Sequence, residues 1–203
     1  MADLPFPVEA ALADRLARAL DTEGKILRAL EALGPVAGRD VLLVGESSTV
    51  RCRQLVELGA RVEPIDRLVP SAGPAASADV IVSTWSGFRG VDEADLAEAD
   101  RLLRPGGRLL VVHDYGRDDV SRLRGDLPEY GAWSRRDGPF LRNGFKIRVV
   151  HCWWTFDSLE DAADFLDAAF GPAGGTVAAE LKRPRLSYNV AVYHRSRGET
   201  SLP

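Results

Sequence analysis

The sequence has few of the features that mark secreted, membrane or metal-binding proteins. Its 203 residues include only two cysteines, Cys52 and Cys152, which form neither a disulfide framework nor a metal site by their spacing. No apolar run approaches the roughly 18 residues that a membrane helix needs. The first residues lack a basic segment followed by an apolar core, so we expect no signal peptide. We therefore expect a cytoplasmic protein without a bound metal.

The chain has no overall excess of positive charge. The net charge is -4, whereas a general nucleic-acid-binding protein is usually basic. Two stretches depart from this balance: residues 117–148 hold eight basic residues against five acids, and residues 182–197 hold five Lys and Arg with no acid. We interpret these stretches either as solvated faces or as the lining of a site for an anionic substrate.

The composition that remains is that of an ordinary globular protein. Apolar types make up 45% of the residues and charged types 28%, and the length suits one domain over 1–203. Helical spacing of apolar residues predicts helices over 7–20 and, from a cap at Thr22, up to Leu33. We expect residues 1–38 to pack as N-terminal helices on the rest of the domain.

Strand and helix patterns alternate after residue 40. Short apolar runs predict strands at 41–44, 61–65, 79–84 and 108–113, with helices over 49–58 and 93–103 between them. A long strand over 145–156, a helix over 159–170 and a last strand over 188–194 follow. This alternation is typical of an α/β domain with a mainly parallel sheet.

Two of the predicted strand ends suit a ligand that contains a nucleoside. In parallel sheets, ligands bind beyond the carboxyl ends of the strands. The first strand is followed by Gly45-Glu46-Ser47-Ser48, where free N–H groups at a strand-to-helix turn favour a carboxylate or phosphate. Asp66 ends the next strand, and a carboxylate there can accept both hydroxyl protons of a ribose. Asp66 can equally cap the next turn.

The segments around these residues carry a family resemblance. VLLVGESSTVRCRQLVELGARVEPIDR resembles the first strand, glycine loop, helix and second strand of class I S-adenosylmethionine-dependent methyltransferases. ADLAEADRLLRPGGRLLVVHDYG is similar to a later helix and the fifth strand of that family. The resemblance covers roughly residues 24–194. It implies a three-layer Rossmann-like fold, a mainly parallel sheet with an antiparallel last strand, and S-adenosylmethionine as the cofactor.

The sequence departs from the family's pattern at two places. Leu43 stands where the family has an acid, and Ser47 and Thr49 replace two glycines of its loop. A β-branched residue does not readily take the left-handed backbone that glycine permits. Only residues 67–78 join the second predicted strand to the next, too few for a crossover that contains its own helix and strand. We therefore expect the family's third strand to be missing, which leaves the order 2-1-4-5-7-6 in the family's numbering.

The resemblance extends the set of candidate site residues. Trp85 follows the strand at 79–84 and joins Gly45, Glu46, Ser47, Ser48 and Asp66 as a candidate for cofactor binding; it can also simply cover the core. His113 and Asp114 end the strand at 108–113 and form the candidate catalytic pair, because a neutral histidine beside a carboxylate can act as a general base. A histidine bonded to a loop carbonyl in the core is the alternative.

Two functions remain open at this point. The first is a methyltransferase that acts on a small-molecule acceptor, because methyl transfer requires mainly the positioning of two reactants. The second is a catalytically inactive protein of the same fold that uses exposed Trp85, Trp133, Trp153 or Trp154 at a protein interface. A nicotinamide oxidoreductase is disfavoured, because its fingerprint requires glycine at the position of Ser47. We favour the enzyme, expect neither membrane nor general nucleic-acid binding, and leave a homodimer open.

Overall fold

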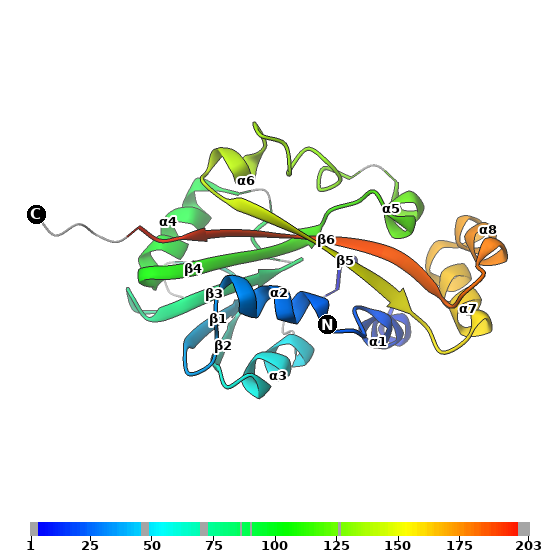
Figure 1. The fold of residues 1–203 in the computed structure, drawn as a ribbon, viewed down its shortest axis with the longest axis horizontal. Coiled ribbons are helices and arrows are strands. Elements are labelled where there is room, and N and C mark those ends of the chain that lie inside the picture. Colours follow the sequence, from blue (N-terminus) through cyan, green and yellow to red (C-terminus); the bar gives the residue numbers. More distant parts are fainter. Residues whose placement is uncertain are drawn as a thin grey trace, which may run out of the picture.

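The computed structural model describes residues 4–45, 49–69, 73–85, 87–89, 91–125 and 127–198. Helices lie on both sides of one twisted sheet, which gives three layers (Figure 1). The strands are β1 (Asp40–Val44), β2 (Arg61–Ile65), β3 (Ala78–Thr84), β4 (Leu103–Asp114), β5 (Lys146–Thr155) and β6 (Arg185–Ser196). The helices are α1 (Ala10–Ala19), α2 (Lys25–Leu33), α3 (Thr49–Glu57), α4 (Glu93–Leu102), α5 (Asp119–Arg124), α6 (Pro139–Arg142), α7 (Leu159–Phe170) and α8 (Pro172–Glu180).

The sheet has the order β2-β1-β3-β4-β6-β5. The strands β2, β1, β3 and β4 are parallel, while β6 is antiparallel to both of its neighbours, β4 and β5. This order confirms the predicted fold class. It also confirms the missing third strand, because β2 is the outermost described strand on its side and pairs with β1 alone.

The sheet separates two apolar cores. Val41 and Leu43 of β1 face a core that includes residues of α1, α2, α3 and α7, while Leu42 and Val44 face a second core with α4 and α6. Successive side chains of a strand point to opposite faces, so a strand covered on both sides reads as a continuous apolar run. This explains why a run of only four residues was enough to predict β1. No helix in the described part of the chain is both long and apolar enough to cross a membrane.

The start of α2 differs from the prediction. Thr22 does not cap this helix; instead the carboxylate of Asp21 accepts the N–H groups of Lys25 at 2.9 Å and Ile26 at 2.7 Å. The helix therefore begins at Lys25, two residues later than a cap at Thr22 requires. An aspartate bonded to free N–H groups of the first turn satisfies the same donors that a threonine cap satisfies.

No sequence pattern predicted α8, which packs against α7 as a helical hairpin. Its first turns contain Gly174 and Gly175, which lower helix propensity. Close packing explains one of them: Gly174 is buried, and a Cβ added there would overlap the backbone carbonyl of Leu166 in α7. A Cβ on Gly175 would meet only the Asp167 side chain, at an ordinary contact distance of 3.5 Å.

The two glycines of α8 therefore form a matched pair for a stability test. We expect Gly174→Ala to lower the free energy of unfolding by about 2 kcal/mol, because the methyl group forces α7 and α8 apart. Gly175→Ala should leave it unchanged or raise it by about 0.5 kcal/mol through helix propensity. Urea unfolding followed by circular dichroism measures both, and equal effects of the two substitutions would contradict the close contact.

Candidate functional site

The carboxyl ends of β1 and β2 meet at one edge of the sheet. Val44 is in register with Ile65, and the N–H of Gly45 donates to the carbonyl of Ile65 at 3.1 Å. Gly45 and Asp66 follow these residues directly, so the two lie beside each other at the ends of neighbouring parallel strands. The Asp66 side chain is exposed. The structure thus brings together the two residues that the sequence singled out first.

The backbone of the loop after β1 requires a glycine at its first position. Gly45 has a φ of 138°, which L side chains rarely adopt. Glu46, Ser47 and Ser48 lie outside the described residues, and α3 begins directly after them at Thr49. The positive φ of Gly45 therefore agrees with the need for a glycine at this position. The binding roles of the three residues after it stay predictions.

The loop after β3 adds a glycine that the sequence did not single out. A Cβ on Gly87 would lie 2.7 Å from the hydroxyl of Ser83 and 3.1 Å from a methyl group of Val44. The loop therefore crosses close to the end of β1, next to Gly45. The available signal was a glycine two residues after Trp85, at the end of a predicted strand.

Asp114 is a buried carboxylate that receives four donors, of which the Tyr130 hydroxyl is the most distant, 3.5 Å from Oδ2. The indole Nε1–H of Trp85 donates to Oδ1 at 3.0 Å, and the Tyr188 hydroxyl donates to the same oxygen. Arg124 of α5 forms an ion pair with Oδ2. The carboxylate at the end of β4 thereby connects the end of β3, the first half of β6 and α5.

Burial sets the protonation of this network. It raises the pKa of Asp114 above its ordinary value, while Arg124, Tyr188 and Trp85 act in the opposite direction. It also raises the pKa of Tyr188 well above its ordinary value, and the Asp114 charge adds to this effect. Tyr188 consequently stays a protonated donor.

His113 lies on the opposite face of the sheet from Asp114. Its ring is fully buried, with Nε2 3.3 Å from the Phe88 carbonyl and an edge contact to Trp133 at a centroid distance of 4.9 Å. Burial lowers the pKa of His113 from 6.5 to about 3, so the ring is neutral at physiological pH. The two neighbours in sequence are thus not brought together as a pair, because adjacent strand residues point to opposite faces. Their catalytic roles stay predictions.

The tryptophans are not arranged as an exposed interface. Trp85, Trp133 and Trp154 are only 2%, 9% and 0% exposed, and Trp153 is half-buried. The expectation that exposed tryptophans form a docking surface is wrong for the three buried ones, which fill the two cores. Of the four tryptophans, only the half-buried Trp153 remains a candidate for such an interface. The described residues contain no group of His, Cys, Asp and Glu side chains that could hold a metal ion.

Solved structures share this architecture. A protein from Anaeromyxobacter dehalogenans assigned as a type II methyltransferase superposes with a TM-score of 0.51 at 17% identity, over 86% of this chain and 96% of that one. The MccD protein superposes with a TM-score of 0.50 at 14% identity, over 87% of this chain and 99% of that one. The chain has the class I methyltransferase fold. No protein-family model and no curated protein matches the sequence.

The buried His113 should make the protein sensitive to acid. Between pH 6.5 and about 3 the unfolded chain binds a proton at this residue and the folded chain does not, so stability is lost as the pH falls. We expect wild type to lose about 1.4 kcal/mol more per pH unit than His113→Gln in this window. Urea unfolding at pH 7, 6 and 5 measures the difference, and parallel curves would show that His113 titrates normally in the folded state.

Proposed function

We propose that this protein is an S-adenosylmethionine-dependent methyltransferase that binds its cofactor at the edge formed by Gly45 and Asp66. The register of β1 against β2 carries the proposal, because it sets a strained glycine turn and an exposed carboxylate side by side at the ends of two parallel strands. Ligands of open α/β sheets bind at such strand ends. The methyltransferase fold of the chain supports the assignment of this pair of residues to cofactor binding.

Each residue of this edge has a binding role in the proposal. The carboxylate of Asp66 accepts hydrogen bonds from the two ribose hydroxyls. Gly45 makes the turn, and the residues that follow it in the loop to α3, Glu46, Ser47 and Ser48, provide backbone N–H groups for the carboxylate of the methionine part. Gly87 keeps the loop after β3 close to the end of β1, in a space that a Cβ would fill. When bound, the cofactor supplies an electrophilic methyl group on a positively charged sulfur.

The residues at the end of β4 contribute in a different way. Asp114 holds the Trp85 indole through Nε1 and so fixes the turn after β3, which makes Asp114 a positioning residue in this conformation. His113 stays a candidate base whose ring must gain access to the acceptor before it can take a proton. The net charge of -4 favours a small-molecule acceptor over a nucleic acid.

Calorimetric titration with S-adenosylmethionine and S-adenosylhomocysteine tests the cofactor site. We expect wild type to bind both, and Asp66→Ala to bind at least about 10-fold more weakly because two hydroxyl contacts are lost. Glu63→Ala is the matched control: it removes an exposed acid from β2, three residues before Asp66, and should bind as wild type does.

Two results would contradict the proposal. The first is no heat of binding for wild type with either ligand at millimolar concentration. The second is binding that Asp66→Ala and Glu63→Ala leave equally intact, which would show that the ligand does not bind at the β1–β2 edge. A circular dichroism spectrum of each variant shows whether a loss reflects the site or the fold.

A further inference from the structure

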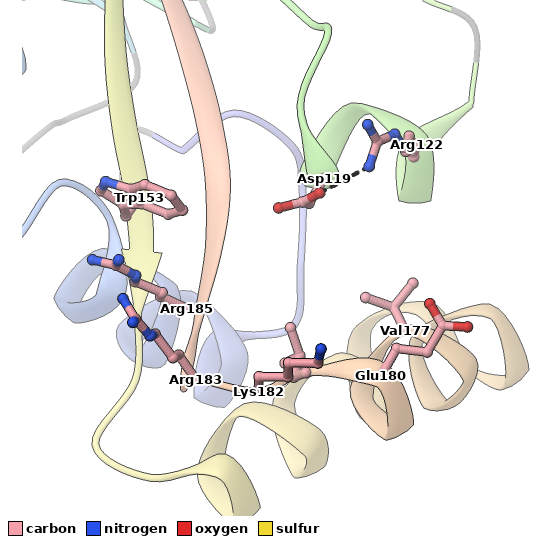
Figure 2. A pocket seen from close by; sticks show the side chains of 9 residues that line it. Asp119, Arg122, Trp153, Val177, Glu180, Lys182, Arg183 and Arg185 are labelled. Carbon is pink, nitrogen blue, oxygen red and sulfur yellow. Dashed lines mark hydrogen bonds and ion pairs between the residues drawn. The ribbon is translucent and has the colours of Figure 1, made fainter.

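A cavity, shown in Figure 2, lies at the opposite edge of the sheet from Gly45 and Asp66. Its volume is about 470 Å³, within the range of small-molecule sites. The end of β5, the start of β6, α5 and α8 form its walls. Because β5 is four strand positions from β1 in the sheet, the two places are about 19 Å apart across the sheet. A ligand in this cavity is therefore distinct from one held by Asp66.

The cavity carries an excess of positive charge. Four basic and two acidic residues line it; Lys182 and Arg183 come from the short segment that joins α8 to β6, and Arg185 is the first residue of β6. None of these three forms an ion pair with another described residue. The side chains of Lys182 and Arg183 are exposed and can turn toward a ligand.

One of the two acids in this cavity, Asp119, is already engaged, while the other, Glu180, is exposed. The carboxylate of Asp119 accepts the N–H and the hydroxyl of Ser187 at 2.9 and 2.6 Å, and its other oxygen pairs with Arg122 at 2.9 Å. Figure 2 shows this pair across the cavity from Trp153, Arg183 and Arg185. Asp119 therefore offsets the charge of Arg122 and leaves the cations between α8 and β6 to attract an anion.

One wall of the cavity is apolar and contains an aromatic ring. Trp153 of β5 is half-buried, and the guanidinium of Arg185 lies 4.2 Å from its ring centroid. This cation–π contact holds the indole in place beside the cationic segment. Val177 and Leu181 extend the apolar lining. The cavity thus presents a fixed ring and a cluster of cations within one small volume.

We propose that this cavity binds a small organic molecule that carries a planar ring and a phosphoryl group. The ring contacts Trp153, and the phosphoryl group is held by Arg183 and Lys182 at the mouth. Three adjacent cations suit a dianion better than a single carboxylate, and arginine binds phosphoryl oxygens in pairs. The acids of α7, which packs against α8, disfavour an extended polyanion such as a nucleic acid here: Glu160, Asp161, Asp164 and Asp167.

Phenyl phosphate is the probe that tests this site. We expect it to shift the indole N–H resonance of Trp153 in nitrogen-15 spectra, and to bind at least about 10-fold more tightly than inorganic phosphate because the ring adds apolar contact. Trp153→Leu assigns that resonance and should reduce the affinity for phenyl phosphate to that for inorganic phosphate. Binding is measured by calorimetry for each variant.

A matched pair of double variants tests whether binding depends on the cationic residues of the cavity or only on the net charge of the protein. Lys182→Ala with Arg183→Ala should weaken phenyl phosphate binding at least about 10-fold. Lys146→Ala with Arg148→Ala removes the same charge from exposed positions on β5, outside the cavity, and should bind as wild type does. Asp66→Ala should also bind phenyl phosphate normally, so this site and the proposed cofactor site succeed or fail separately.

Three outcomes would overturn the inference. No binding of phenyl phosphate up to about 10 mM would remove the site altogether. Equal loss in the two double variants would show that only net charge matters. A single-stranded oligonucleotide that binds more tightly than phenyl phosphate and depends on Lys182 and Arg183 would replace the small ligand by a nucleic acid.

Discussion

A single buried carboxylate organises the carboxyl end of the sheet. Asp114 has its two oxygens covered by an indole, a phenol and a guanidinium, which come from three separate parts of the chain. Leaving a buried carboxylate without these donors would cost several kcal/mol, so the donors and the acceptor keep one another in place. Arg124 also donates to the Pro5 carbonyl at 3.1 Å, which ties the segment before α1 to the same point.

The short helix α5 connects this network to the cavity at the β5 edge of the sheet. Arg124 lies at its C-terminal end and pairs with Asp114, while Asp119 begins the helix and bonds to Ser187 of β6. Asp118 caps the helix, and its other oxygen accepts the N–H of Asn189 at 2.8 Å. Both ends of α5 are thereby fixed to β4 and β6.

The sequence was informative wherever a short local pattern decided the structure. The apolar runs predicted the strands, and the 12-residue connection at 67–78 predicted the missing strand and hence the sheet order. The place of Asp66 beside Gly45 followed from these two results alone, because parallel neighbours end at the same edge. The strands themselves needed only the period of a strand, whereas the sheet order and the missing strand also rested on the family resemblance.

Such local patterns could not predict contacts between residues that are distant in the sequence. Tyr188 reaches Asp114 across 74 positions, and no periodicity marks either residue for the other. The burial of His113 depends on Trp133, which comes from an irregular segment with no strand or helix pattern. The helix α8 was hidden because Gly174 serves packing against α7 rather than helix propensity.

The missing strand also leaves one edge of β2 without a described partner strand. Gly45 and Arg39 bond to the backbone of Ile65 and Arg61, so these alternate residues direct their N–H and C=O groups toward β1. Val62 and Pro64 therefore direct theirs to the open side, where proline has no N–H to donate. The side chains of Arg61 and Glu63, on either side of Val62, are exposed and charged. The chain has shortened its sheet and ended it with a strand that discourages other chains from pairing, which protects the protein from edge-to-edge aggregation.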